Sequence, residues 1–137
     1  MTHYGGNAFR YEEVSNWAQL PADFELGEVV DIAVDRQDRV YIFSRGKNPV
    51  MLFERDGRFI QSWGEGLFTR PHGISIDKSG DLYCADDDGH WIGRFTPEGK
   101  LLSSYGNRNL GAVAQSGNPF NKPTKVAFSP DTEDIYI

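Results

Sequence analysis

The sequence predicts an all-β fold, a β-propeller of four-stranded antiparallel units that forms an incomplete ring in one chain. Of its 137 residues, 15 are glycine and 13% are aromatic, a composition that favours a turn-rich β protein over a helical one. Short runs of alternating or β-branched residues follow one another, separated by Gly, Asp, Asn and Pro turns. This pattern recurs every 42 residues, the length of one propeller blade.

Four short motifs define the repeat, and each returns at the same spacing without a gap. They are an Ile-x-(Val/Ile)-Asp motif, a hydrophobic-Tyr-hydrophobic motif, an acidic-Gly-basic motif and a Ser-aromatic-Gly motif. The pairs are 32–35 with 74–77, 40–42 with 82–84, 56–58 with 98–100, and 62–64 with 104–106. Four agreeing registers predict two copies of one structural unit.

Each unit is expected to contain four strands. In the first unit they are placed at about 29–34, 39–44, 50–54 and 59–63, and in the second at about 73–76, 81–85, 91–95 and 101–105. A third unit begins with an inner strand at 124–128 and continues at 134–137. We treat residues 1–137 as a single partial propeller domain, divided into a closing outer strand (8–18), blade one (27–66), blade two (69–106), a surface loop (107–122) and the start of blade three (123–137).

The N-terminal segment 11–17 resembles the fourth strand of the other units, with Trp17 at the place of Trp63 and Tyr105. In a propeller, an outer strand from one terminus can complete a blade begun by the other, so we expect this segment to close a ring. Two and a half blades do not close a ring alone. Either the chain is a fragment of a longer propeller, or a homodimer completes a six-bladed ring.

Charge and hydropathy exclude several classes of partner. The net charge is −6, which disfavours nucleic acid and anionic membranes as partners. No apolar run approaches the roughly 20 residues of a membrane span, and the N-terminus lacks the pattern of a signal peptide. We therefore expect a cytoplasmic location. The single cysteine, Cys84, lies in an apolar strand and is expected to be a buried thiol.

Candidate site residues lie where inner strands enter and leave the central channel of a propeller. His72 directly precedes the second inner strand, where a neutral imidazole is a good ligand for zinc or iron. Arg45 ends the second strand of unit one and is placed to bind a carboxylate, although a solvated loop arginine is the alternative. Asp86 and His90 belong to an Asp-Asp-Asp-Gly-His run. They are candidates to orient His72 without binding the metal or substrate themselves.

These motifs resemble a known family. The repeats look like NHL-type blades, and three segments together resemble the peptidyl-α-hydroxyglycine α-amidating lyases, especially their bacterial relatives. The segments are Phe-Ser-Arg-Gly at 43–46, the Arg-Pro-His-Gly stretch within 67–77, and Phe-Asn-Lys-Pro-Thr-Lys-Val-Ala at 120–127. The pairing of Phe-x-Arg-Gly with Pro-His-Gly at this separation is the discriminating feature.

The resemblance implies a six-bladed propeller that cleaves a peptidyl-α-hydroxyglycine into a peptide amide and glyoxylate. It implies a zinc held by three histidines and a structural calcium. By this resemblance His72 matches a zinc ligand, Arg45 binds the substrate carboxylate, and the backbone carbonyls of Ile32 and Ile74 match calcium ligands. Pro119 stands where the family has its second histidine, and the remaining site residues would lie in other blades.

The sequence thus supports two readings of function. In the first, the full-length protein is lyase-like and acts on a small peptide or carboxylate ligand, with this chain inactive by itself. In the second, the propeller is a non-catalytic module that binds a ligand or a protein, because the fold alone does not imply chemistry.

Overall fold

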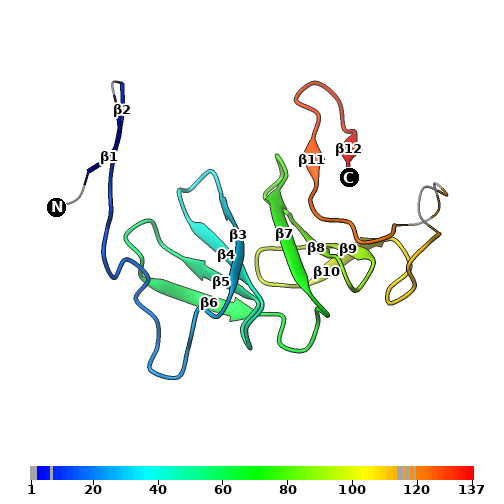
Figure 1. Cartoon of the computed structure of the whole chain (residues 1–137), viewed down its shortest axis with the longest axis horizontal. Coiled ribbons are helices and arrows are strands. Elements are labelled where there is room, and N and C mark those ends of the chain that lie inside the picture. The colour runs from blue at the N-terminus through cyan, green and yellow to red at the C-terminus, as the bar shows by residue number, and fades with distance from the viewer. Residues whose placement is uncertain (1–2, 7, 114–115, 117, 119) are drawn as a thin grey trace.

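The computed structural model describes residues 3–6, 8–113, 116, 118 and 120–137. It contains two four-stranded antiparallel sheets and two two-stranded sheets (Figure 1). The first blade consists of β3 (Val29–Val34), β4 (Val40–Ser44), β5 (Val50–Phe53) and β6 (Phe59–Trp63), hydrogen-bonded in that order. The second consists of β7 (Pro71–Ile76), β8 (Leu82–Asp86), β9 (Trp91–Phe95) and β10 (Leu101–Tyr105), in the same order.

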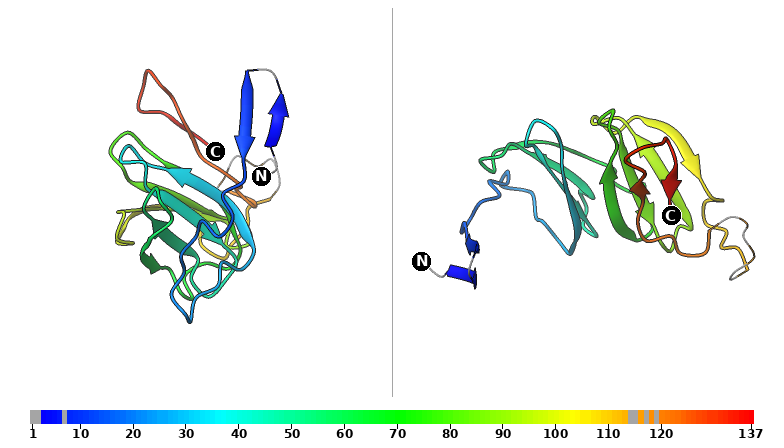
Figure 2. Two further views of the ribbon diagram at one scale, coloured as in Figure 1. Left: turned by 90° about the vertical axis from the view of Figure 1, so that its left-hand side faces the viewer. Right: turned by 90° about the horizontal axis from the view of Figure 1, so that it is seen from above.

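The two blades stand side by side, with the inner strands β3 and β7 next to each other (Figure 1). A third unit, β11 (Ala127–Phe128) paired with β12 (Ile135–Tyr136), follows on the far side of the second blade (Figure 2). The all-β prediction and the blade architecture are confirmed. No helix long and apolar enough to cross a membrane occurs among the described residues.

The predicted strand positions agree with the structure to within one or two residues in both blades. One difference concerns the site: β7 begins at Pro71, so His72 is the second residue of the inner strand instead of its predecessor. In the third unit, strand pairing covers only two residues of each predicted strand.

The N-terminal segment differs from its predicted form. The strand there is β2 (Phe9–Glu12), which pairs with β1 (His3–Gly6) in a hairpin, and residues 13–17 form no strand. Asn16 takes a left-handed backbone conformation (φ 56°), which turns the chain before Trp17 and is incompatible with an extended strand through this position. The closing of a ring by this segment stays a prediction.

Trp17 nevertheless makes the same contacts with blade one that Trp63 makes with blade two. The Trp17 indole donates a hydrogen bond to the Arg55 carbonyl (2.9 Å), and Trp63 donates to the Pro97 carbonyl (3.2 Å), 42 residues further on. Each indole also lies over a hairpin glycine, Gly57 or Gly99. Trp17 therefore occupies the position of an outer-strand tryptophan from a preceding blade.

The main core lies between the two blades. Side chains of Tyr41, Phe43, Trp91 and Phe95 are buried there. At one end of this core, the Trp63 ring packs against the Phe95 ring, with the ring centroids 4.9 Å apart. Cys84 is fully buried in the same cluster, as predicted, and burial raises the pKa of its thiol, which makes it a poor nucleophile.

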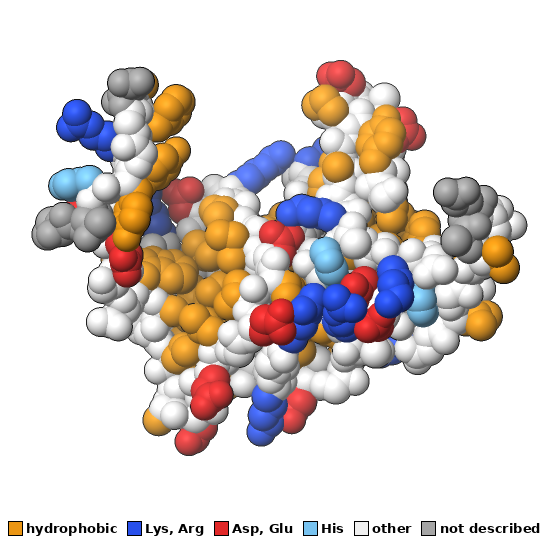
Figure 3. All heavy atoms as spheres, in the orientation of Figure 1, with side chains coloured by type: hydrophobic (Ala, Val, Ile, Leu, Met, Phe, Trp, Pro, Cys, Tyr) orange, Lys and Arg blue, Asp and Glu red, His pale blue; other side chains and the backbone are white. Residues whose placement is uncertain are grey.

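The two faces at the ends of this short array are open. On one side, Val29, Ile32 and Val34 of β3 are exposed, and Figure 3 shows hydrophobic side chains on the blade-one side below the hairpin. On the other side, a hollow of about 530 Å³ lies between blade two and the β11–β12 unit, with Tyr83 and Tyr105 in its wall. The exposed apolar face of β3 can pack against a further blade, whereas charged side chains such as Asp77 and Arg94 line the hollow together with the tyrosines.

Tyr83, in the wall of this hollow, predicts how stability responds to alkali. Burial, with a contribution from Tyr105, raises the pKa of Tyr83 to about 12. The pKa of the Tyr83 hydroxyl in the folded chain lies above the unfolded value of about 10. Its contribution to the free energy of unfolding is therefore fully present below pH 10 and is lost as the pH rises towards 12. We expect Tyr83→Phe to reduce the loss of unfolding free energy over that range by on the order of 2 kcal/mol, which appears as a smaller fall in thermal midpoint.

The matched control is Tyr136→Phe, since Tyr136 is 61% exposed. Circular dichroism melts at pH 8 and between pH 10 and 12 provide the measurement. If the thermal midpoints of the wild type and Tyr83→Phe fall equally with pH, Tyr83 is not the group whose raised pKa causes the loss.

Candidate functional site

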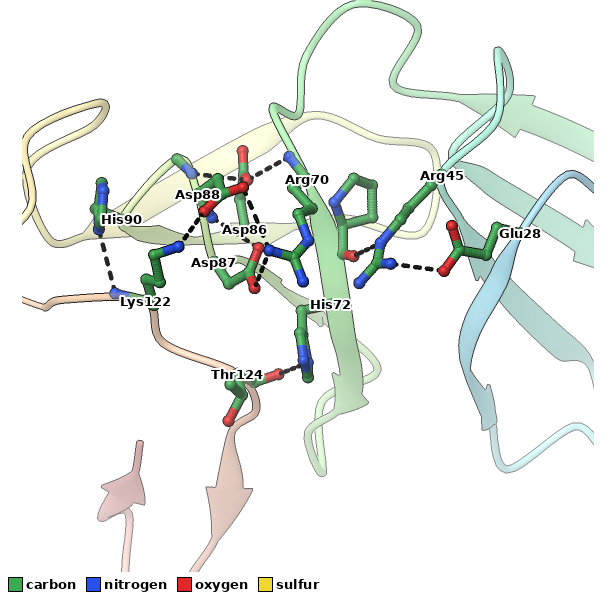
Figure 4. A network of polar contacts seen from close by, with 12 residues as sticks. Glu28, Arg45, Arg70, His72, Asp86, Asp87, Asp88, His90, Lys122 and Thr124 are labelled. Carbon is green, nitrogen blue, oxygen red and sulfur yellow. Dashed lines mark hydrogen bonds and ion pairs between the residues drawn. The ribbon is translucent and has the colours of Figure 1, made fainter.

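The candidate site lies at the entrance of the inner strand β7, where three chain segments meet (Figure 4). His72 comes from β7, Arg45 follows β4 of the neighbouring blade, and Lys122 to Thr124 arrive from the segment that leads into β11. In Figure 3, Lys and Arg side chains gather in the middle of this face together with histidine. Asp and Glu side chains lie among them, so this face carries a network of paired charges.

His72 is partly buried and held by one hydrogen bond. Its Nδ1 lies 3.2 Å from the backbone carbonyl oxygen of Thr124. A carbonyl only accepts, so this contact requires a hydrogen on Nδ1. In the neutral ring the Nε2 lone pair is then available to a metal or a proton, an arrangement typical of metal-binding histidines whose other nitrogen donates to a carbonyl.

Arg45 reaches from blade one to the residue before His72. Its Nε donates to the Pro71 carbonyl (3.1 Å), and Nη1 pairs with Glu28 Oε1 (2.6 Å). Arg45 and Arg70 also line a hollow of about 190 Å³ between the blades. The Glu28 carboxylate, which is 67% exposed, contacts the guanidinium through Nη1 alone and can be replaced by an incoming carboxylate.

Asp86 is the buried residue that shapes the entrance of β7. Its side chain is 0% exposed. Its carboxylate accepts four hydrogen bonds, from the backbone N–H groups of Thr69 (2.7 Å), Arg70 (2.8 Å) and Gly89 (2.9 Å) and from the Trp91 indole (3.1 Å). Two of these donors immediately precede Pro71 and His72. Asp86 therefore fixes the direction in which the chain enters β7.

A second group of charged side chains joins the turn after β8 to the segment that leads into β11. Arg70 Nη1 lies 3.5 Å from Asp87 and 3.4 Å from Asp88, and Lys122 Nζ lies 2.7 Å from Asp88. The hydrogen bond from the Lys122 ammonium, assisted by Arg70 and partly offset by burial, lowers the pKa of the Asp88 carboxyl. These pairs hold the segment before β11 against the turn that follows β8.

His90 ends that turn in a left-handed conformation (φ 57°). Its Nδ1 accepts a hydrogen bond from the backbone N–H of Lys122 (3.2 Å). The ring packs against Gly111, where a Cβ would come within 2.7 Å of the imidazole. His90 thus contacts the segment that also contacts His72, but the structure gives no direct bond between the two histidines.

Asp31 is a site residue that the sequence interpretation missed. Its Oδ1 accepts from the backbone N–H of Ile32 (3.0 Å), and its Oδ2 accepts from the N–H of Ile74 (2.9 Å) and from Lys125 Nζ (2.7 Å). One carboxylate therefore links the inner edges of all three units. Lys125 corresponds to Gly73 of blade two and Asp31 of blade one, but the long insertion before it breaks the 42-residue spacing that would have revealed this.

The carbonyls of Ile32 and Ile74 face the inner edge of their sheets. Asp35 N–H bonds to the Arg39 carbonyl and Asp77 N–H to the Asp81 carbonyl. Because hydrogen-bonded pairs alternate along an antiparallel ladder, Ile32 and Ile74 belong to the pairs whose backbone groups point away from the neighbouring strand. Two carbonyl oxygens directed to the same edge are suitable ligands for calcium.

The described part of the chain holds no group of three or more His, Cys, Asp or Glu side chains arranged to bind a metal ion. His72 fits one position of a zinc site through Nε2, and further ligands would have to come from elsewhere. Pro119, at the place of the second histidine implied by the family resemblance, lies outside the described residues.

The structure thus brings His72, Arg45 and Asp86 together at the entrance of β7. His90 contacts the segment whose Thr124 carbonyl bonds to His72. Ile32 and Ile74 lie further along the inner strands. The roles of these residues in metal binding and catalysis stay predictions. Thr124, Lys122 and Asp31 are additional participants, and only their position in the fold reveals them.

Comparison with known proteins gives relatives named as peptidylglycine α-amidating monooxygenases and as amidating lyases. No protein-family model matches the chain. Peptidylglycine α-amidating monooxygenase of Rattus norvegicus is 28% identical over 161 residues, covering 94% of this chain and 16% of the relative. A probable peptidyl-α-hydroxyglycine α-amidating lyase of Caenorhabditis elegans is 25% identical over 129 residues, covering 77% and 36%. The chain therefore spans only a small part of these relatives.

A shorter match has higher identity. Peptidyl-α-hydroxyglycine α-amidating lyase 1 of Drosophila melanogaster is 31% identical over 83 residues, covering 59% of this chain and 15% of the relative.

Solved structures support the fold. Selenomethionine-substituted virginiamycin B lyase from Staphylococcus aureus superposes with a TM-score of 0.59 at 19% identity, covering 81% of this chain and 34% of that one. A streptogramin B lyase superposes with a TM-score of 0.55 at 19% identity, covering 76% and 31%. At this identity the likeness shows the propeller fold alone. The chain is a β-propeller segment whose sequence is similar to amidating lyases and monooxygenases.

Proposed function

We propose that this chain is part of a metal-dependent lyase propeller that cleaves a peptidyl-α-hydroxyglycine into a peptide amide and glyoxylate, with NHL-type blades. The observation that carries the proposal is the geometry of His72. Its Nδ1 is engaged by the Thr124 carbonyl, its Nε2 is available, and Arg45 bonds to the residue beside it. The sequence relatives named as amidating lyases support the same reaction class.

In this proposal each residue has a separate task. Arg45 exchanges Glu28 for the carboxylate of the hydroxyglycine and orients the substrate. The substrate hydroxyl loses its proton, the bond between the α-carbon and the amide nitrogen breaks, and the nitrogen gains a proton. The products are the peptide amide and glyoxylate. A zinc ion bound at His72 Nε2 would supply the Lewis acidity that favours loss of the hydroxyl proton.

We also propose a calcium site, and a source for the metal ligands that the described residues do not provide. The carbonyls of Ile32 and Ile74 would hold calcium at the inner edge and thereby join blades one and two. We propose that further blades cover the exposed face of β3 and the hollow beside β11–β12, supplied by a second copy in a homodimer or by more of the same polypeptide. Such blades would bring the remaining metal ligands to the channel.

The test measures zinc content and native mass together. We expect native mass spectrometry to show zinc on the chain and on His3→Ala, a control for a histidine on the distant hairpin. We expect His72→Ala to bind zinc more than about tenfold more weakly, since it removes a ligand. The same spectra report whether two copies associate.

Two results would contradict parts of this proposal. Equal zinc binding by the wild type and His72→Ala would exclude His72 as a ligand. The second result would be tight binding of a hydroxyglycine peptide in the absence of zinc, with no release of glyoxylate by an assembled ring. It would favour the propeller that binds a ligand without catalysis.

A further inference from the structure

The segment Lys122 to Thr124, called here the 122–124 segment, lies between two imidazoles of blade two (Figure 4). At one end, the backbone N–H of Lys122 is 3.2 Å from His90 Nδ1. At the other end, the Thr124 carbonyl oxygen is 3.2 Å from His72 Nδ1. The middle residue, Pro123, is buried and has no N–H, so Lys122 provides the backbone donor that anchors the segment to the turn.

The two contacts require opposite tautomers. A backbone N–H only donates, so His90 Nδ1 must be without a hydrogen, and a neutral His90 carries its hydrogen on Nε2. A backbone carbonyl only accepts, so His72 Nδ1 must carry a hydrogen, and a neutral His72 has its lone pair on Nε2. Three consecutive residues therefore impose different hydrogen positions on two rings.

We infer that His90 is a positioning residue for His72. By accepting the Lys122 N–H, it holds the Thr124 carbonyl against His72 and thereby selects the tautomer of His72 that leaves Nε2 available. This inference rests on the proposed function, in which Nε2 is the metal-binding atom. The sequence indicated only that His90 could support His72; the inference specifies that it does so through the 122–124 segment, without a direct bond.

The conformation of the two anchoring residues supports this role. His90 and Lys122 both have positive φ angles, 57° and 56°, which are uncommon for residues other than glycine and are kept where the surroundings impose them. His90 is further fixed by its own N–H, which donates to the Asp87 carbonyl (3.2 Å), and by Gly111 on its ring. The acceptor atom is thus held rigidly where the segment passes.

The ion pair between Lys122 and Asp88 offers a competing explanation, since it also joins the segment to the turn. The Lys122 side chain is 56% exposed, so this pair contributes little compared with a backbone hydrogen bond in a fixed geometry. Substitutions can separate the two. Lys122→Ala removes the ion pair and keeps the N–H, whereas His90→Ala removes the acceptor and keeps the ion pair.

His90→Asn is the conservative variant. The Asn side-chain oxygen lies the same number of bonds from Cα as His Nδ1, so it can accept the same hydrogen bond. Asn also tolerates a positive φ better than most residues. If the acceptor atom is what matters, Asn should preserve the position of the 122–124 segment.

The experiment records long-range ¹H–¹⁵N correlation spectra of the imidazoles at pH 8, on the metal-free 137-residue chain and three variants. We expect His72 to be protonated at Nδ1 in the wild type, Lys122→Ala and His90→Asn. We expect His90→Ala to shift the tautomer ratio of His72 about fivefold towards Nε2–H, the usual effect of losing one hydrogen bond. Near-ultraviolet circular dichroism confirms that each variant retains its aromatic packing.

The inference is overturned if His90→Ala leaves the tautomer of His72 unchanged, if Lys122→Ala shifts it equally, or if His72 carries its hydrogen on Nε2 in the wild type. It is also overturned if His90→Asn behaves like His90→Ala, because ring packing would then hold the segment. The measurement uses no metal and no turnover. A correct tautomer pattern without zinc binding would therefore contradict the proposed lyase and leave the role of His90 intact.

Discussion

Substitution of Asp86 by alanine is expected to destabilise the chain by about 3 to 5 kcal/mol, because it leaves several buried donors without an acceptor. The carboxylate accepts from three backbone N–H groups and from the Trp91 indole, and its side chain is fully buried. The bonds from the Gly89 N–H and the Trp91 indole are buried, and those from Thr69 and Arg70 are partly buried. Urea denaturation followed by tryptophan fluorescence measures the loss.

Two controls make this result specific. Asp23→Ala removes an exposed carboxylate and should change stability by less than about 0.5 kcal/mol. Asp86→Asn keeps the shape but turns an NH₂ group towards N–H donors, so it should fall between the wild type and alanine. A loss below 1 kcal/mol for Asp86→Ala would mean that the four hydrogen bonds contribute little.

Comparison of the blades shows why this carboxylate concerns the site. The residue of blade one that corresponds to Asp86 is Ser44, 42 positions earlier, and it is equally buried. Its hydroxyl has no hydrogen-bond partner among the described residues. A blade therefore forms without a carboxylate at this position. The carboxylate occurs in the blade whose inner strand carries His72, where it fixes the two residues before Pro71.

The strands of both blades were predictable because their residues alternate locally and the alternation repeats. The turns share this regularity. Asp35 and Asp77, 42 residues apart, each accept from N–H groups two and four residues ahead, so an aspartate at this position of the motif indicates the turn. The sequence prediction was weaker at the N-terminus, because 11–17 alternates like a strand but Asn16 turns the chain.

The site was only partly predictable, since its members come from segments far apart in sequence. His72 and Arg45 were recognised from short motifs next to predicted strands. The contact of His72 with Thr124 spans 52 residues, and that of Asp31 with Lys125 spans 94. The insertion before the third unit shifts the repeat by ten residues and hides these equivalences. No local pattern distinguishes a carbonyl that orients a histidine from one exposed to water.

Gly73→Ala is expected to separate the 122–124 segment from β7 and to cost about 1 to 3 kcal/mol, the usual range for overpacking. Gly73 is buried and follows His72 on the inner strand. A Cβ at this position would overlap the Thr124 carbonyl oxygen and lie 3.3 Å from the Lys125 Cα and Cβ atoms. The obstacle is backbone, so a side-chain rotation cannot relieve it. The Thr124 carbonyl must move, and His72 then loses its acceptor.

The matched control is Gly6→Ala, because an added Cβ there meets nothing within 4 Å and its φ is not positive. For Gly73→Ala we expect faster cleavage by trypsin after Lys125, a lower thermal midpoint and the same shift of the His72 tautomer as in His90→Ala. The two substitutions act on opposite sides of the segment, one by removing an anchor and one by adding an obstacle. A common effect on His72 would show that the position of Thr124 controls the imidazole. If Gly73→Ala lowers stability but leaves His72 unchanged, the Thr124 carbonyl does not orient it.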